Sequence, residues 1–379
     1  MRFFLIIFCS FVCICSAKQK SPNILMIIVD DLRPQLGCYG ASDTLSPNID
    51  RIASEGTLFE TAYVQVPVCG ASRASLMTGL YPTSTRFVTY YSSADKDAVG
   101  IPDIPKQLKS AGYTTISNGK IYHNVNDNTN SWSEIHRSPD FRIYLDEATK
   151  RMYRDKDAAY EAADVDDDAY PSGKMTNKII NDIRKAHKSN SPFFITAGYT
   201  KPHLPFNAPK KYWDMYDREL INLANNHYAP EGAPSQSLHK WHELRSGYGG
   251  MPSDGPLSDN LAKTLIHGYY ACVSYTDKLI GDLLDELEQL NLHNDTIVLL
   301  MGDHGWQLGE HALWCKHSLY ETSLHTPLII KAPGYNKGQR TDALVEFVDI
   351  YPTICDLAGV KKPSHLQGKS LVALMENPK

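Results

Sequence analysis

Five short apolar runs, separated by stretches of helical periodicity, are the feature that most restricts how this chain can fold. The runs cover residues 24–29, 113–117, 193–197, 297–301 and 328–330. Between them, apolar side chains recur with the spacing of a helix in residues 48–55, 103–110, 175–188 and 260–290. Strands and helices that alternate in this way are typical of a mainly parallel sheet covered by helices on both faces. We therefore predict an α/β fold of this kind.

Length and charge set further limits. The chain has 379 residues, with 38 lysines and arginines against 43 aspartates and glutamates, which gives a net charge of −5. This length exceeds the usual single core, so we expect one large domain with a smaller C-terminal part. The negative balance argues against a chain-wide surface for nucleic acids or other polyanions. Any anion site must then be local.

Acidic residues follow two of the predicted strands directly. Asp30 and Asp31 come after the apolar run I-L-M-I-I-V, and Asp303 and His304 come after the run at 297–301. Because sites in open parallel sheets lie beyond the carboxyl ends of the strands, we expect these side chains to lie together. Adjacent buried carboxylates are costly unless a cation neutralises them. The oxygen-rich set suits a hard ion, calcium or magnesium, better than zinc.

Two lysines and two histidines also follow predicted strands. Lys120 and His123 stand in G-K-I-Y-H, His203 stands in K-P-H-L-P-F, and Lys316 ends the segment W-Q-L-G-E-H-A-L-W-C-K. A single histidine is more often structural than catalytic. Four such side chains after strand ends indicate a cradle for an anion.

The stretch P-V-C-G-A-S-R-A-S-L-M-T-G, residues 67–79, places Cys69 at the predicted start of a helix, with Arg73 one turn further on. Backbone N–H groups at a helix N-terminus attract anions, and a nearby cation favours a thiolate. Cys69 is therefore a candidate nucleophile. Taken alone, the pattern is more often only a cysteine at a loop-helix junction.

The same stretch resembles the signature of the formylglycine-dependent sulfatases, in which C-x-[P/A]-S-R is followed by a leucine and a T-G pair. In that family the cysteine is converted after translation into formylglycine, an aldehyde whose hydrate is the nucleophile. The resemblance implies the alkaline phosphatase-like sulfatase fold and a partner that matures Cys69, either a formylglycine-generating enzyme or a radical maturase. Ala71, where the family commonly has proline, leaves open which of the two acts.

The resemblance also implies a metal site. It assigns one divalent ion, usually calcium, with magnesium as the alternative, to Asp30, Asp31, Asp303, His304 and the modified Cys69. Many sulfatases have asparagine at the position of His304, so the histidine points to a subgroup.

Catalytic roles follow from the same resemblance. Arg73, Lys120 and Lys316 would hold the nucleophile and the sulfate oxygens. His203 would protonate the departing sugar oxygen, and His123 would deprotonate the second hydroxyl of the hydrate so that sulfate leaves. Both roles need a group that titrates near the working pH, which histidine supplies.

Three longer motifs resemble those of iduronate-2-sulfatase-like enzymes. They are G-K-I-Y-H, K-P-H-L-P-F and G-D-H-G-W-Q-L-G-E-H, and the match extends from Asp30 to about Tyr351. The subgroup implies exo-acting hydrolysis of a sulfated saccharide, with a 2-sulfated uronic acid as the preferred substrate. Family members usually continue into a C-terminal subdomain with a small antiparallel sheet. We therefore expect residues 18–379 to form a sulfatase domain that lacks most of that subdomain.

Residues 1–17 have the pattern of a secretory signal peptide. Arg2 precedes an apolar run at residues 3–15, and the small residues Ser16 and Ala17 follow. The run is shorter than the roughly 20 residues that span a bilayer. We expect a secreted or periplasmic protein without a membrane span, and a retained N-terminal anchor is the alternative.

Three other functions stay open. The substrate could be a choline or aryl sulfate in place of a sulfated sugar. A phosphatase or phosphodiesterase of the same superfamily would use a similar anion cradle, although such enzymes commonly use serine or threonine with two zinc ions. The third alternative is a non-catalytic binder of sulfated glycans.

Overall fold

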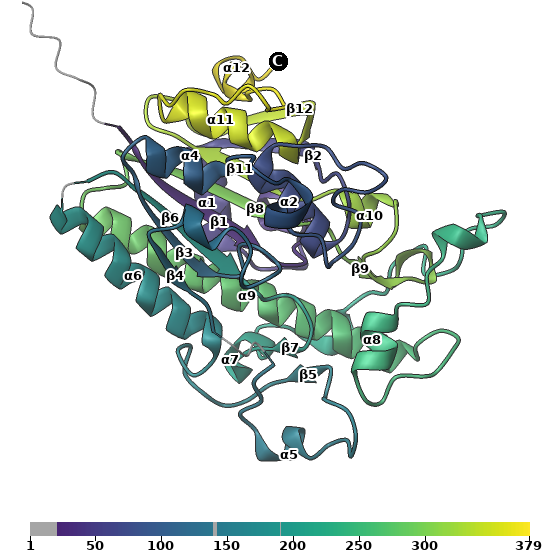
Figure 1. The fold of residues 1–379 in the computed structure, drawn as a ribbon. Coiled ribbons are helices and arrows are strands. Elements are labelled where there is room, and N and C mark those ends of the chain that lie inside the picture. Colours follow the sequence, from purple (N-terminus) through teal and green to yellow (C-terminus); the bar gives the residue numbers. More distant parts are fainter. Residues whose placement is uncertain (1–20, 139–141, 190) are drawn as a thin grey trace, which may run out of the picture.

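A central sheet of eight strands forms the middle layer of the computed structural model (Figure 1). The structure describes residues 21–138, 142–189 and 191–379, so the predicted signal peptide at residues 1–17 lies outside the described residues. Along the sheet, the strand order is β12-β2-β11-β8-β1-β6-β3-β4. In the described part of the chain, no helix combines the length and the apolar composition needed to cross a bilayer.

The five predicted strands are confirmed. They are β1 (Asn23–Val29), β3 (Thr114–Gly119), β6 (Phe193–Tyr199), β8 (Thr296–Gly302) and β11 (Leu328–Lys331). β1 pairs in parallel with β6 and with β8, and β3 pairs in parallel with β6. β11 is antiparallel to both of its neighbours. The sheet is therefore mainly parallel, as predicted, with one reversed strand.

Three further strands complete the sheet: β2 (Thr57–Tyr63), β4 (Glu134–His136) and β12 (Gln339–Glu346). β4 and β12 are the two edge strands. None of the three was predicted from the sequence. β4 and β12 mix exposed polar residues with few apolar ones.

Helices cover both faces of the sheet (Figure 1). The four predicted helices are present as α1 (Pro47–Glu55), α4 (Ile104–Ser110), α6 (Pro171–Ser189) and α9 (Asp259–Gln289), and α2 (Cys69–Thr78) begins at the cysteine, as predicted. A further helix, α11 (Ile350–Leu357), lies near the C-terminus. α1, α6 and α9 pack on one face, whereas α2, α4 and α11 pack on the other.

Alternate side chains of β1 enter the two cores. Leu25, Ile27 and Val29 pack against α6 and α9, and the intervening Ile24, Met26 and Ile28 pack against α2 and α11. Burial of each such side chain contributes about 1.5–3 kcal/mol. A strand that is apolar on both faces must lie in the middle of the sheet, and its carboxyl end is the place to look for a site.

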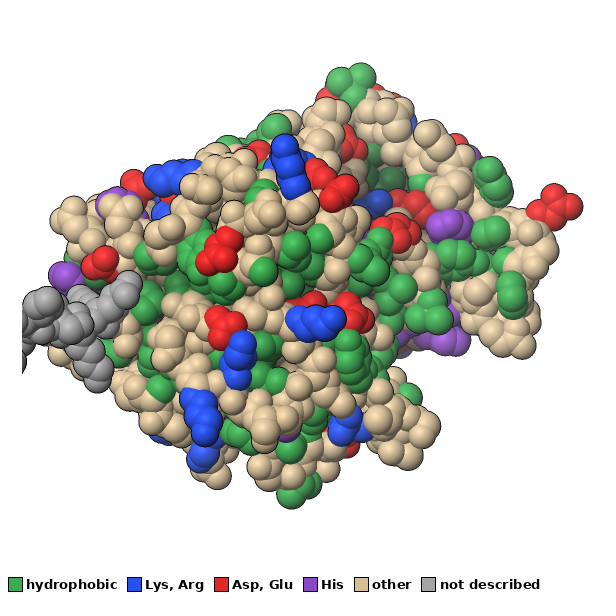
Figure 2. Space-filling model, turned by 90° about the horizontal axis from the view of Figure 1, so that it is seen from above, with side chains coloured by type: hydrophobic (Ala, Val, Ile, Leu, Met, Phe, Trp, Pro, Cys, Tyr) green, Lys and Arg blue, Asp and Glu red, His purple; other side chains and the backbone are tan. Residues whose placement is uncertain are grey.

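The outer surface is mixed in charge. The face in Figure 2 carries basic and acidic side chains interspersed among neutral ones. This agrees with the expectation that an anion site is local and built inside the molecule.

Candidate active site

The predicted metal ligands meet where β1 and β8 end. Val29 pairs with Gly302 across the two parallel strands, so Asp30 and Asp31 lie beside His304. Ligand atoms of Asp30, Asp31, Cys69 and His304 all lie within 4.8 Å of one another, and all four residues are buried. Four donors from three separate segments therefore surround one point.

Cys69 enters this cluster as the first residue of α2. Its Sγ lies 3.1 Å from Nε2 of His304 and 3.5 Å from Oδ1 of Asp30. Burial, with the Asp30 charge, raises the pKa of the Cys69 thiol to about 12. The thiol is thus protonated at neutral pH, which makes it a poor nucleophile in its unmodified form.

Arg73 binds carboxylates and carbonyls of the protein. Its Nε donates to Oδ2 of Asp303 at 2.8 Å, its Nη2 to Oδ1 of Asp30 at 3.4 Å, and its Nη1 to the carbonyl oxygens of Lys120 and Ile121. The side chain is fully buried. Arg73 therefore holds two of the predicted ligands in place, and Asp303 lies beside the four-residue cluster with one oxygen committed to Arg73.

Two buried lysines neutralise the aspartate pair. Nζ of Lys120 donates to Oδ2 of Asp30 at 2.5 Å, and Nζ of Lys316 donates to Oδ1 of Asp31 at 3.0 Å. Burial lowers the pKa of each lysine, but the surrounding negative groups, with the neighbouring aspartate first among them, together outweigh burial and raise the pKa above the usual value. Both lysines are therefore charged at neutral pH.

The adjacent aspartates have different protonation behaviour. Burial disfavours the charged form of Asp30, but Lys120, His203 and Arg73 outweigh burial, so the pKa of Asp30 lies well below its usual value. For Asp31, burial and the Asp30 charge dominate over Lys316, and the pKa is raised well above its usual value. A divalent cation between them would favour the charged form of both.

His203 lies over the same end of the sheet. Its Nδ1 is 2.6 Å from the carbonyl oxygen of Leu204, and its Nε2 is 3.0 Å from Oε1 of Glu243. The ring is held between two acceptors, which fixes its orientation. Burial and the Lys316 charge lower the pKa of His203, and the Glu243 carboxylate partly offsets them.

His123 lies further out, with its ring centroid 6.0 Å from that of Tyr90. Its Nδ1 is buried without a hydrogen-bond partner among the described residues. Burial, with the Lys120 charge, lowers the pKa of His123 to about 3. The ring is therefore neutral at neutral pH, and its pKa lies well below the working pH near which its predicted role as a base requires it to titrate.

Glu243 is a site residue that the sequence analysis missed. It lies on α8 (His242–Gly247), and its Oε1 is 3.0 Å from Nζ of Lys316 and 3.0 Å from Nε2 of His203. A second group of potential metal ligands, Asp31, His203 and Glu243, shares this position. The segment W-H-E-L-R has no strand before it and no motif that would single out the glutamate.

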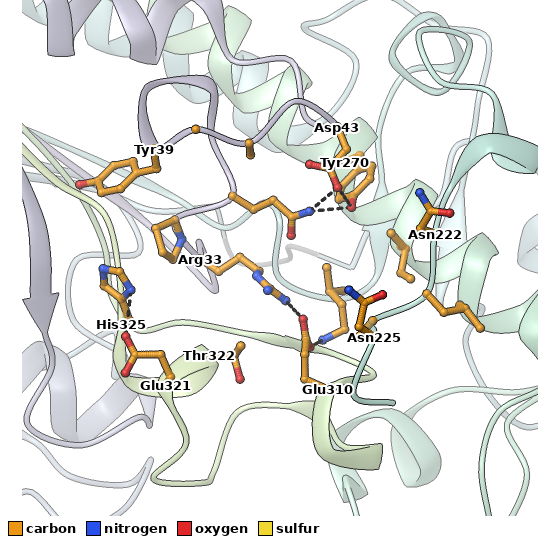
Figure 3. A pocket seen from close by; sticks show the side chains of 18 residues that line it. Arg33, Tyr39, Asp43, Asn222, Asn225, Tyr270, Glu310, Glu321, Thr322 and His325 are labelled. Carbon is orange, nitrogen blue, oxygen red and sulfur yellow. Dashed lines mark hydrogen bonds and ion pairs between the residues drawn. The ribbon is translucent and has the colours of Figure 1, made fainter. Parts of the chain in front are cut away.

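A separate cavity lies near this cluster and does not include it. A volume of about 640 Å³ is lined by polar residues such as Arg33, Asp43, Tyr270 and Glu310 (Figure 3). Arg33 pairs with Glu310 at 2.7 Å, and Tyr270 donates to Asp43 at 2.6 Å. These groups are paired with one another, so the buried cluster is the better candidate for the site.

Comparison with known proteins agrees with this geometry. The family model described as Sulfatase matches residues 22–360. Human iduronate 2-sulfatase is 34% identical over 382 residues, which cover 90% of this chain and 70% of that protein. Choline-sulfatase from Rhizobium meliloti is 28% identical over 371 residues, which cover 89% and 68%. A solved protein in complex with its substrate D-glucosamine-2-N,6-O-disulfate matches with a TM-score of 0.75 at 26% identity, covering 95% of this chain and 81% of that one.

Proposed function

Since this chain belongs to the sulfatase family and is a sulfuric ester hydrolase, we propose that it removes sulfate from a saccharide, with a 2-sulfated uronic acid as the preferred substrate. Its fold is the alkaline phosphatase-like fold of the sulfatases, as the sequence predicted. The observation that carries the substrate proposal is the 34% identity to human iduronate 2-sulfatase over 90% of this chain. A choline or aryl sulfate is the second candidate, because choline-sulfatase is also similar.

The residues at the end of β1 and β8 fit a divalent cation. Asp30, Asp31 and His304 supply carboxylate oxygens and an imidazole within 4.8 Å, beside residue 69. Hard, oxygen-rich ligands favour calcium, with magnesium as the alternative. Such an ion supplies positive charge next to the sulfate group when it is bound. We expect Asp303, held by Arg73 at 2.8 Å, to complete the ligand set.

Cys69 fits the maturation that its family uses. Its burial at the start of α2 and its protonated thiol leave the native side chain without a strong nucleophile. Conversion to formylglycine by a formylglycine-generating enzyme or a radical maturase would place an oxygen nucleophile at this position once the aldehyde is hydrated. Both kinds of maturase stay open.

The chain's own side chains divide the remaining work. Lys120 and Lys316, which carry their charge at neutral pH, neutralise the sulfate oxygens. His203, held at 3.0 Å by Glu243, donates a proton to the sugar oxygen as its bond to sulfur breaks. His123, which is neutral, accepts a proton from residue 69 as sulfate departs.

A panel of esters tests this proposal. Purified protein that contains formylglycine is offered 2-sulfated uronates, other regioselectively sulfated saccharides, choline and aryl sulfates, and the matching phosphate esters. We expect the highest kcat/KM for the 2-sulfated uronate. Turnover of choline or aryl sulfates alone would reject the saccharide, and preferential turnover of phosphate esters would reject sulfate as the reacting group.

Export completes the proposal. Residues 1–17 would direct the chain out of the cytoplasm. Sulfated polysaccharides occur outside the cytoplasm, so the exported chain would meet them there. N-terminal sequencing of the protein from its own host measures whether these residues are removed.

A further inference from the structure

Arg137 is a cation beside the site that the proposed chemistry does not use. It directly follows β4, and its Nη1 and Nη2 donate to the carbonyl oxygens of Tyr122 and His123 at 2.9 and 3.0 Å. Arg137 takes part in none of the ion pairs that the described residues form. A guanidinium has five N–H donors. Among the described residues, the donors beyond these two bonds have no carboxylate partner, so they can bind an anion.

The surroundings of Arg137 disfavour its charge. Burial and the Arg73 charge lower the pKa of Arg137, and the Asp30 charge only partly offsets them. Arginine is still charged at neutral pH. A half-buried cation close to another cation, with no carboxylate bound to it, gains stability when an anion arrives.

An aromatic pair also lies close to His123. The ring centroids of Tyr90 and Tyr91 are 3.9 Å apart, and that of Tyr90 is 6.0 Å from His123. Both rings are open to solvent, with exposed fractions of 45% and 71%. Exposed aromatic rings at a site offer an apolar face to a ligand.

The backbone fixes this pair next to the reacting residue. A Cβ atom on Gly70 would lie only 2.2 Å from the carbonyl oxygen of Tyr90, so the tyrosine segment packs directly on the start of α2. Nδ2 of Asn124 donates to the carbonyl oxygen of Ser92 at 3.2 Å, which ties the same segment to the residue after His123. The two tyrosines are therefore exposed rings on an anchored backbone.

We propose that Arg137, Tyr90 and Tyr91 form a subsite around His123 that binds the substrate's uronic acid, with its carboxylate on Arg137 and one ring face on the tyrosines. This inference rests on the proposed function. Guanidinium binds carboxylate through two parallel hydrogen bonds, which specifies both charge and orientation. The C–H face of a pyranose ring is apolar, so it can pack on an exposed aromatic ring and remove apolar surface from water.

Matched substrates test the carboxylate. We compare a 2-sulfated uronate glycoside with its carboxyl-reduced counterpart, and with a carboxyl-reduced sugar that bears a second sulfate at position 6. Arg137→Met should lower kcat/KM for the uronate about tenfold to a hundredfold, mainly through KM. It should leave the carboxyl-reduced sugar unchanged, and Arg137→Lys should retain part of the rate. An equal loss on all three sugars, or a loss confined to the disulfated sugar, would overturn the proposal.

The tyrosines are tested by conservative pairs. Tyr91→Leu should raise KM for both the uronate and its reduced counterpart, whereas Tyr90→Phe and Tyr91→Phe keep the ring and should leave KM unchanged. The matched control for Arg137→Met is Arg340→Met, which removes an exposed arginine that is paired with Glu60 at the opposite edge of the sheet. Unchanged KM in Tyr91→Leu would remove the tyrosines from the subsite.

Binding separates this inference from the proposed hydrolysis. In a Cys69→Ala background the uronate stays intact, and its Kd is measured by calorimetry with and without Arg137→Met. We expect Arg137→Met to weaken binding of the uronate about tenfold or more and to leave the thermal midpoint unchanged. Tight, Arg137-dependent binding in the Cys69→Ala background, together with no sulfate release by the formylglycine-containing native chain, would reject the hydrolysis and keep the subsite. Binding that is indifferent to Arg137 would sink the subsite alone.

Discussion

Shared carboxylates hold the site together at the scale of single residues. Glu243 accepts from Lys316 and from His203 at 3.0 Å each, in the way that Asp30 accepts from Lys120 and Arg73. Each carboxylate fixes two side chains of the proposed site relative to one another, so loss of its charge disturbs both.

Glu243→Gln should therefore lower kcat/KM for the sulfate ester about tenfold to a hundredfold, since a hydrogen bond to a charged group contributes about 1.5–3 kcal/mol. Glutamine keeps the shape and removes the charge. Steady-state kinetics measures the effect, with Glu219→Gln on an exposed turn as the control. A higher kcat/KM in Glu243→Gln would contradict this and would mean that the carboxylate competes with sulfate for Lys316.

His123 should make stability depend on pH. Burial and Lys120 lower its pKa from 6.5 to about 3, so the folded state disfavours the protonated ring. The folded state is therefore fully stable with respect to this group above pH 6.5. Its free energy of unfolding falls as pH drops from 6.5 toward about 3, because His123 of the unfolded chain binds the proton first. Urea unfolding at several pH values gives the free energy of unfolding as a function of pH. Between pH 6.5 and about 3, this free energy should change less with pH in His123→Gln than in the native chain. The same pH dependence in both chains would reject a neutral, buried His123 ring.

The sequence predicted the position of site residues best where a polar side chain follows an apolar run, while their roles stay predictions. Asp30, Asp31, Asp303 and His304 were found because the strands before them are unambiguous. Glu243 was missed because α8 has only six residues in a segment without clear periodicity. A contact made by tertiary packing leaves no local signal of that kind.

At the scale of elements, the register between β1 and β8 brings the proposed metal ligands together. Their parallel pairing places the two acidic strand ends side by side, and α2 delivers Cys69 from the next layer. The strands that the sequence predicted were those buried on both faces of the sheet. The edge strands β4 and β12 and the reversed direction of β11 depend on pairing partners distant in the sequence, which local periodicity does not reveal.

Binding of the metal ion should raise the free energy of unfolding and the thermal midpoint of the chain. Calcium at a hundred times its Kd should stabilise the folded chain by about 2.7 kcal/mol, because only the folded state brings the ligands together. Asp30→Ala or Asp303→Ala should abolish both this rise in thermal midpoint and turnover. Metal analysis after dialysis checks the stoichiometry. Two tightly bound zinc ions per chain would contradict a single hard-ion site.

The start of α1 should depend on a residue of α9. Oδ1 of Asp277 accepts from the backbone N–H groups of Asn48 and Ile49 at 3.0 and 2.8 Å, and α1 has no side-chain cap of its own at Ser46. Asp277→Ala should cost about 1–2 kcal/mol of unfolding free energy, measured by urea denaturation. Asp277→Asn should recover part of it. Equal stability of the alanine variant would show that α1 does not need this cap.

At the scale of the whole molecule, the sheet gathers side chains from distant parts of the chain into one buried centre. Residues from Asp30 to Lys316 meet there, so no single segment carries the activity. The signature at residue 69 gives the centre its expected chemistry, while the sheet supplies the charges around it. We propose that residue 69, in oxidised form, is the nucleophile of this centre.

Peptide mass spectrometry of residue 69, set against specific activity, tests this claim most directly. Preparations of the native chain with different degrees of maturation are assayed for sulfate release, and the fraction of aldehyde at residue 69 is measured in each. We predict that activity is proportional to that fraction and vanishes in Cys69→Ala, which should unfold at the same temperature as the native chain. Full activity in a preparation whose residue 69 is an unmodified thiol would contradict the account.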